Sequence, residues 1–207
     1  MNEKITIAVD AMGGENSPNK VIDGIKIVLK DNKNIYFNLF GKSDQINNLI
    51  INNDLLKEKC KIIDCELIIK DNESPLQAAK KNKKSSMWQA INSVKMNESQ
   101  VALSAGNTGA LLILSKMILN MIEGIDKPAL AGLWPNKKGM NIVLDLGANI
   151  ECSDKNLIDF SYMGSSLYKS LFPKLMPKIA ILNVGSEEIK GHDEIKKAYK
   201  FLKENKI

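Results

Sequence analysis

The 207-residue sequence predicts an α/β protein with a largely parallel sheet. Short runs rich in β-branched residues alternate with segments whose apolar residues recur at helical spacing. Several of these runs end in a turn that contains glycine, as is typical of a strand that passes directly into a helix. We find no internal repeat, no linker and no shift in composition, so we expect a single domain over residues 1–207.

The first half of the chain predicts three strands, each followed by a helix. The strands are expected at residues 5–9, 35–40 and 61–65. Ser17 is the expected N-cap of the first helix, because Pro18 suits a first helical turn. Ser43 or Asp44 is expected to cap a second helix that runs through Ile51. The third strand leads to short helices that begin at residues 75 and 86.

The second half of the chain continues the alternation. A buried strand at residues 101–104 and a helix over residues 108–121 flank a glycine turn at 104–109. Further strands are expected at 129–134, 141–146 and 178–183, and further helices at 155–170 and 188–203. Alternating strands and helices with short loops indicate helices on both faces of the sheet.

The turn Ser104-Ala-Gly-Asn-Thr-Gly109 is the strongest candidate for a binding site. Gly106 and Gly109 let the backbone turn sharply and approach a ligand closely. The first turn of the following helix offers free N–H groups, which favour an anion. Ser104, Asn107 and Thr108 add two hydroxyls and an amide. The residues therefore predict that this turn binds an anionic substrate.

Three more junctions join it as candidate substrate-binding or catalytic segments. They are Asp10-Ala-Met-Gly13-Gly14, Asp145-Leu-Gly147-Ala-Asn149 and Asn183-Val-Gly-Ser-Glu-Glu-Ile-Lys190-Gly-His192. Because the carboxyl ends of parallel strands share one edge of a sheet, we expect the four junctions to converge on one crevice. Each junction alone is also compatible with a plain tight turn.

Lys190 is the candidate catalytic residue. It lies between two glycines and can meet a phosphate, and the sequence contains no arginine that could do so instead. His192, the one histidine, is a candidate general base or simply an exposed loop residue. The positive field of the site must then come from Lys190 and from backbone N–H groups.

Composition excludes several classes of function. The three cysteines have no CxxC spacing and no metal-ligand cluster accompanies them, so neither a disulfide framework nor a zinc site is expected. The chain has neither a Walker A loop nor a GxGxxG fingerprint. Its formal charge of +5 is spread along the sequence, without a block that would suggest a nucleic-acid arm. No signal peptide or membrane span is recognisable, so a cytoplasmic location is expected.

Four motifs together resemble one family, the bacterial phosphate acyltransferases known as PlsX. They are Ile-Ala-Val-Asp-Ala-Met-Gly-Gly, Ser-Ala-Gly-Asn-Thr-Gly-Ala, Leu-Asp-Leu-Gly-Ala-Asn and Asn-Val-Gly-Ser-Glu-Glu-Ile-Lys-Gly, in this order. The resemblance covers nearly the whole chain. It implies formation of acyl phosphate from acyl-acyl carrier protein and inorganic phosphate, at the entry to phospholipid synthesis.

The resemblance also implies a three-layer α/β/α sandwich related to the isocitrate and isopropylmalate dehydrogenases and to phosphotransacetylase. It implies a homodimer without metal or nucleotide cofactor that associates peripherally with the membrane, with a membrane acyltransferase as the expected partner there. Family members continue beyond residue 207 through a section that completes the site. We therefore expect that this chain lacks a C-terminal section, and that alone it is unstable or inactive unless a partner covers the exposed surface.

Three alternatives remain open. The chain could be a non-catalytic remnant that binds acyl carrier protein or a membrane surface. It could also be a phosphotransacetylase that uses acyl-CoA. A decarboxylating dehydrogenase is disfavoured, because such an enzyme needs arginines for its substrate carboxylates and an aspartate cluster for a metal.

Overall fold

The computed structural model describes residues 4–81, 83–185, 187 and 190–205. The packing of the chain divides it into two compact units, Met1–Asn120 (the N-terminal unit) and Met121–Ile207 (the C-terminal unit). Each unit is described by itself, and the single domain expected over residues 1–207 stays a prediction. Within the described part of the chain, no helix has the length and apolar character needed to cross a membrane.

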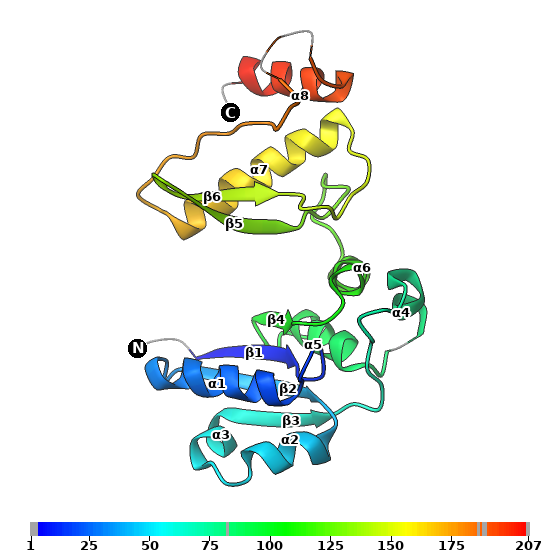
Figure 1. The fold of residues 1–207 in the computed structure, drawn as a ribbon, viewed down its shortest axis with the longest axis vertical. Helices are drawn as coiled ribbons and strands as arrows, with labels where there is room; N and C mark the ends of the chain where they lie inside the picture. The colour runs from blue at the N-terminus through cyan, green and yellow to red at the C-terminus, as the bar shows by residue number, and fades with distance from the viewer. Residues whose placement is uncertain (1–3, 82, 186, 188–189, 206–207) are drawn as a thin grey trace. The chain divides into compact units, whose positions relative to one another are not determined.

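A four-stranded parallel sheet forms the centre of the N-terminal unit (Figure 1). Its strands, in spatial order, are β3 (Cys60–Asp64), β2 (Ile35–Gly41), β1 (Ile5–Asp10) and β4 (Val101–Ser104). The chain adds β2 and then β3 on one side of β1, and it places β4 on the other side. The strand order therefore reverses between β1 and β4. In open α/β sheets, ligands bind at such a switch point, outside the carboxyl ends of the strands.

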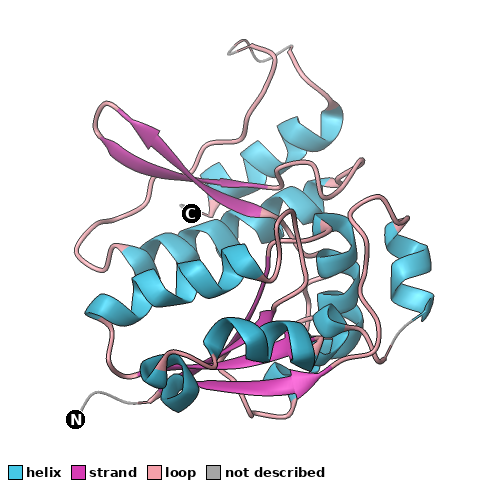
Figure 2. Cartoon of the chain, turned by 60° about the horizontal axis from the view of Figure 1, so that its bottom comes forward, coloured by secondary structure: helices cyan, strands magenta, loops and turns pink. Residues whose placement is uncertain are grey.

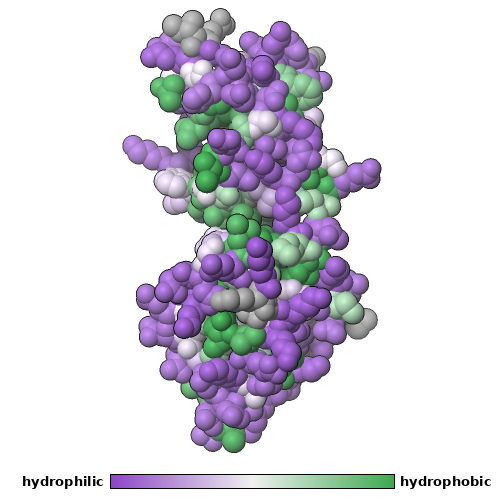
Figure 3. Space-filling model, turned by 90° about the vertical axis from the view of Figure 1, so that its right-hand side faces the viewer, coloured by the Kyte–Doolittle hydropathy of each residue, from purple (hydrophilic) through white to green (hydrophobic). Residues whose placement is uncertain are grey.

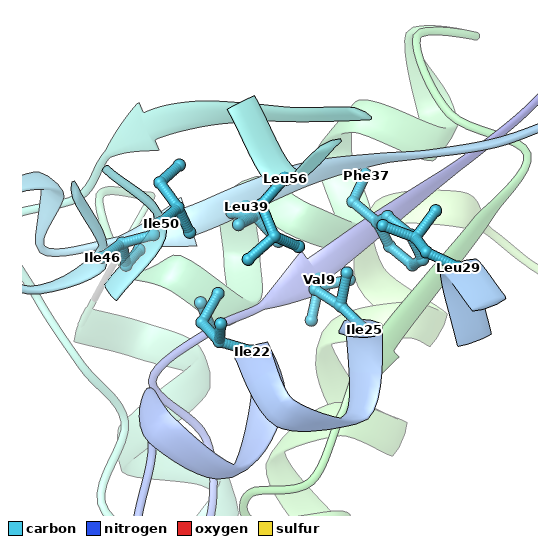
Figure 4. Packing of buried hydrophobic residues seen from close by; sticks show 10 residues of the cluster. Val9, Ile22, Ile25, Leu29, Phe37, Leu39, Ile46, Ile50 and Leu56 are labelled. Carbon is cyan, nitrogen blue, oxygen red and sulfur yellow. The ribbon is translucent and has the colours of Figure 1, made fainter. Parts of the chain in front are cut away.

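Helices cover both faces of this sheet (Figure 2). They are α1 (Asn19–Asp31), α2 (Ser43–Ile50), α3 (Asp54–Lys59), α4 (Pro75–Lys81), α5 (Ser86–Lys95) and α6 (Thr108–Leu119). Val9 and Leu39 pack against the apolar side chains of α1, α2 and α3, as Figure 4 shows. Their strand neighbours Ala8 and Phe40 point to the opposite face and pack against Ala90 of α5. The predicted α/β fold with flanking helices is confirmed.

The C-terminal unit is built on a hairpin. Its elements are β5 (Ala131–Asn136), β6 (Gly139–Leu144), α7 (Asp154–Leu171) and α8 (Asp193–Glu204). The two strands pair antiparallel, and α7 packs against both β6 and α8. A capping box starts α7, in which Ser153 and Asn156 each accept a hydrogen bond from the backbone N–H of the other.

The structure corrects two strand predictions. The strands expected at 129–134 and 141–146 are present, but they form an antiparallel pair and do not extend the parallel sheet. Residues 178–183 do not form a strand within the described chain, and Leu182 there is 93% exposed. The continuous apolar run at residues 179–182 favours a buried strand, but a strand also requires a neighbour that completes the hydrogen-bond ladder.

Several predicted helix starts are also wrong. The Ser17 hydroxyl does not cap α1 and instead donates to the Gly13 carbonyl at 2.6 Å. Ser43 likewise donates through its backbone N and its hydroxyl to the Asp64 carboxylate, at 2.9 and 2.7 Å. The last helix begins at Asp193 rather than residue 188, because Gly191 lies in the left-handed region at φ +86°. The start expected at Ser85–Ser86 is confirmed, with Ser85 as the N-cap.

Both units expose large apolar side chains as well as hydrophilic ones, and the face in Figure 3 displays both kinds. Leu39 and Leu55 offer a matched pair for measuring what burial contributes. The Leu39 side chain is fully buried between the sheet and its helices, whereas Leu55 is 45% exposed.

We predict that Leu39→Ala lowers the free energy of unfolding by about 2–5 kcal/mol, because it leaves a cavity in a packed core. Leu55→Ala should cost less than about 1 kcal/mol, since its methyl groups already meet water. Urea unfolding followed by circular dichroism measures both values. Equal losses for the two variants would contradict the assignment of the core.

Candidate functional site

The first candidate site lies at the switch point between β1 and β4. Asp10 and Ser104 are direct neighbours in the register of these strands. The Ser104 hydroxyl donates to Asp10 Oδ2 at 2.7 Å, and it accepts a hydrogen bond from the Gly106 N–H at 3.1 Å. The Met12 N–H donates to Asp10 Oδ1 at 3.3 Å. One carboxyl group therefore joins the turn after β1 to the turn after β4.

The Asp10 carboxyl is enclosed by the protein. The residue is only 3% exposed, because alternation along β1 directs its side chain to the face covered by α5. Burial raises its pKa above the ordinary value, while the nearby hydroxyls of Ser86 and Ser104 act in the opposite direction. Ser86 is fully buried beside this carboxyl without a hydrogen bond of good geometry. This geometry favours a role for Asp10 in joining the two turns over the predicted contact with substrate, which stays untested.

Glycines allow the two turns to touch. A Cβ added to Gly13 would lie 2.7 Å from both Asp10 Oδ2 and Ser104 Oγ. A Cβ added to Gly14, whose φ is +84°, would lie 2.5 Å from the Ala105 carbonyl oxygen. Contacts below 3.0 Å force atoms to shift. The sequence predicted these glycines as sites of close backbone approach, and here the first partner they approach is the neighbouring turn.

The N-terminus of α6 is the part of this site suited to an anion. Asn107 is its N-cap and accepts from the Ala110 N–H at 2.9 Å. The N–H groups of Thr108 and Gly109 make no hydrogen bond to another described residue. Thr108 is also exposed as a residue. Two free N–H groups at the positive end of a 12-residue helix can bind one anionic group.

Asn107 also clamps a second segment onto this turn. Its Nδ2 donates to the carbonyls of Asp71 and Glu73, at 3.1 and 2.8 Å, and more weakly to Lys70. Pro75, which begins α4, lies so close to Gly109 that an added Cβ would be 2.6 Å from its Cγ. The loop 70–75 is therefore part of the site's architecture, which the sequence did not indicate.

The second candidate site is the loop after β6 in the C-terminal unit. Asp145 has a positive φ of +61°, rare for a residue with a side chain. Its carboxylate accepts from the N–H and Nδ2 of Asn149, at 3.2 and 3.0 Å, and from the Cys152 thiol at 3.4 Å. Asn149 also donates to the Pro128 carbonyl. These contacts order the loop itself, and the substrate-binding roles predicted for Asp145, Gly147 and Asn149 stay predictions.

The cysteines are poor nucleophiles. Burial raises the pKa of the Cys60 thiol to about 11 and that of the Cys65 thiol to about 11. Burial and the Asp145 carboxylate also raise the pKa of Cys152. Since the thiolate is the reactive form, these thiols are largely unreactive near neutral pH.

The candidate catalytic residue lies in the loop between residue 183 and α8. The Asn183 Nδ2 donates to the Lys190 carbonyl at 3.3 Å, and the Lys190 N–H donates to the Glu187 carbonyl at 2.9 Å. The Lys190 residue is exposed and forms no ion pair with another described residue. His192 occupies the N-cap position of α8 but makes no capping hydrogen bond. The part of the motif at residues 186, 188 and 189 lies outside the described residues.

The structure thus brings Asp10, Gly13, Gly14 and Ser104–Gly109 together in the N-terminal unit. It groups Asp145 with Asn149, and Asn183 with Lys190, in the C-terminal unit. Convergence of all four junctions on one crevice stays a prediction. Within the described residues, no group of three or more histidine, cysteine or acidic side chains is arranged to hold a metal ion.

A hollow of about 600 Å³ lies at the opposite, amino edge of the parallel sheet. Lys4, Tyr36 and Lys59 line it, and both ammonium groups lie within 4.3 Å of the Tyr36 ring centroid. Lys59 ends α3, where a cation stabilises the negative end of a helix. The hollow is separate from the switch point, since it lies at the other end of the strands.

Comparison with known proteins identifies relatives along nearly the whole chain. The family model described as "fatty acid synthesis protein" matches residues 5–207. A phosphate acyltransferase of Pelagibacter ubique is 57% identical over 202 residues, which are 98% of this chain and 60% of the relative. One of Agrobacterium fabrum is 39% identical over 201 residues, which are 97% of this chain and 57% of the relative. The chain thus spans under two thirds of the length of these relatives.

Solved structures give the same fold. A phosphotransacetylase from Streptococcus pyogenes superposes with a TM-score of 0.67 over 95% of this chain and 63% of its own, at 14% identity. The EutD phosphotransacetylase from Staphylococcus aureus gives a TM-score of 0.65 over 98% of this chain and 66% of its own, also at 14% identity. At this identity the likeness concerns the fold alone.

We predict that Gly13→Ala lowers the free energy of unfolding by about 1–3 kcal/mol, because its methyl group collides with the Asp10–Ser104 pair. Gly24→Ala is the matched control. A Cβ at Gly24, within α1, meets no atom within 4 Å, so alanine should stabilise by about 0.5–1 kcal/mol. Thermal and urea unfolding measure both. Stabilisation by Gly13→Ala would contradict the contact between the turns.

We predict that Asn107→Asp separates the two functions of this side chain. Aspartate retains the acceptor for the Ala110 N–H but loses the donors to the loop 70–75. Hydrogen exchange of that loop should accelerate, while exchange at the start of α6 remains slow. Asn107→Ala should accelerate both. Unchanged exchange of the loop in Asn107→Asp would show that the clamp is unimportant.

Proposed function

Because the chain belongs to the fatty acid synthesis protein family, we propose that it is a phosphate acyltransferase that forms acyl phosphate from an acyl thioester and inorganic phosphate. The names of its relatives support this proposal. The observation that carries the proposal is the N-terminus of α6 at the switch point, where the N–H groups of Thr108 and Gly109 bond to no other described residue. We call these two N–H groups the cradle. We assign the phosphate to this cradle.

The proposed reaction places two demands on the protein. A phosphate oxygen attacks the thioester carbonyl carbon, a C–O bond forms, and the C–S bond breaks as the thiolate leaves. The phosphate must be held in line with the carbonyl. The backbone N–H groups of the cradle can do this because the helix fixes their positions, so no flexible cationic side chain is needed. The oxyanion of the tetrahedral intermediate needs a positive partner, the role that we assign to Lys190.

We propose acyl carrier protein as the acyl donor, and a place in phospholipid and fatty acid metabolism. A cytoplasmic homodimer that associates peripherally with the membrane fits this role. The net charge of +5 would favour encounter with an acidic carrier protein or an anionic membrane surface. No cofactor is required by the chemistry, since neither electrons nor hydride are transferred.

The phosphotransacetylase folds of the solved relatives keep one alternative open, in which the donor is acyl-CoA. The other alternative is a non-catalytic chain that only binds acyl carrier protein or a membrane. Comparing the two thioester donors separates the first alternative from the proposal, and measurable turnover of either donor excludes the second.

The proposed function predicts that the purified 207-residue chain converts acyl-acyl carrier protein and phosphate to acyl phosphate, which hydroxylamine traps as the hydroxamate. Such turnover would contradict the expectation, drawn from the sequence, that the chain alone is unstable or inactive. Lys190→Ala should lower kcat by about 10²–10³-fold, as expected when one group that stabilises an oxyanion is removed. Lys200→Ala, an exposed substitution on α8, is the control and should leave kcat unchanged. A folded chain without turnover of either donor would overturn the proposed function.

A further inference from the structure

The hydrogen bonds at the switch point have a defined polarity. While the Asp10 carboxyl is ionised it can only accept, so the Ser104 hydroxyl must direct its hydrogen to Asp10 Oδ2. The same hydroxyl oxygen accepts the Gly106 N–H. Ser104 is thus unable to donate to any ligand in this state, although it begins the turn that carries the free N–H groups of Thr108 and Gly109.

We propose that Asp10 is a positioning residue that couples anion binding at this turn to the uptake of one proton. When the anion binds, the Asp10 carboxylate takes a proton from solvent and its new O–H donates to Ser104 Oγ. Ser104 then releases its own hydrogen from Asp10 and can donate it to an anion oxygen. The inference rests on the proposed function in placing an anion, naturally phosphate, at the N-terminus of α6.

The surroundings of Asp10 favour this coupling. From α5 it meets the Ser86 hydroxyl, and from β4 the Ser104 hydroxyl, while its register neighbour on β2 is the apolar Phe40. Two titratable groups interact with its charge, namely Asp71 in the clamped loop and Cys65 after β3. Neither group supplies a positive charge, so neither can offset the negative charge of an anion bound near Asp10.

The sign of the pH dependence follows from linkage. Burial and Asp71 already raise the pKa of Asp10 in the free protein, and a bound anion raises it further. Between the free and the bound pKa, the complex holds more protons than the free protein. Anion affinity must therefore fall as pH rises through this window, by up to about tenfold per pH unit, and become constant above it.

The test is calorimetric titration with sulfate, whose charge stays constant over the working range. Titrations between about pH 5 and pH 8, in pairs of buffers that differ in ionisation enthalpy, give the number of protons taken up. We expect net uptake of up to one proton in the wild type, greatest between the free and the bound pKa of Asp10. Asp10→Asn should bind sulfate with little uptake and with an affinity nearly independent of pH.

Two further variants keep the test decisive if Asp10→Asn folds poorly. Ser104→Ala removes the hydroxyl that would donate to the anion once Asp10 is protonated. This variant should retain some proton uptake, but its sulfate affinity at low pH should be several-fold lower. Asp71→Asn, the control for a general loss of negative charge, should retain the uptake. Circular dichroism establishes that each variant is folded.

Equal proton uptake in the wild type and in folded Asp10→Asn would overturn the inference. Sulfate binding to the wild type without proton uptake would also overturn it, as would the absence of binding to the folded wild type. The proposed function is decided separately by the acyl phosphate assay. A chain that turns over acyl thioesters without the proton linkage would fail only here.

Discussion

The parallel pairing of β1 with β4 is the constraint on which the N-terminal site depends. It places Asp10 directly beside Ser104, although 94 residues separate them in the sequence. Neither side chain could reach the other if β4 were added beyond β3, because β2 and β3 would then lie between Asp10 and Ser104. The reversal of strand order therefore determines which polar groups meet at the carboxyl edge of the sheet.

The cost of this arrangement is a buried carboxyl group, and the glycines make it tolerable. Desolvation disfavours the ionised form of Asp10. The Met12 N–H and the hydroxyls of Ser104 and Ser86 offset part of this penalty. The close contact of Gly13 with Ser104 and Gly106 excludes any side chain that could separate the two turns. Asn107 then extends the same rigid arrangement to the loop 70–75. A ligand at this site would therefore meet backbone groups whose positions are already fixed.

Local signals in the sequence predicted the elements well, and long-range pairing was harder to predict. Glycines and small hydroxyls located the turn at Ser104–Gly109, because the conformation of a turn depends mainly on residues adjacent in the sequence. The adjacency of β1 and β4 leaves no such local signal. The same limit explains why residues 178–183 were expected to form a strand, since a short apolar run does not specify a partner strand.

Two N-cap predictions failed because the helices begin one residue away from the expected position. Ser17 precedes the N-cap Pro18 of α1, and Ser43 follows the N-cap Lys42 of α2, so neither hydroxyl occupies the capping position. Ser17 donates to the turn at Gly13, and Ser43 to Asp64, which is 21 residues away. Asn107, by contrast, caps α6 with its oxygen and uses its nitrogen for the loop. The Asn107 side chain thus serves a local and a distant partner at once, because its oxygen accepts and its nitrogen donates.

The absence of arginine from the sequence gives the backbone groups their importance. Arginine offers a planar fork that fixes an oxyanion in two places, whereas lysine acts as a point charge on a flexible stem. A protein that must orient phosphate without arginine depends on groups that are rigid for another reason, and helix N–H groups are rigid because the helix holds them. Under the proposed function, the turn at Ser104–Gly109 orients the phosphate and Lys190 supplies the positive charge. In that proposal, rigid backbone N–H groups of a glycine turn take the place of a cluster of cations.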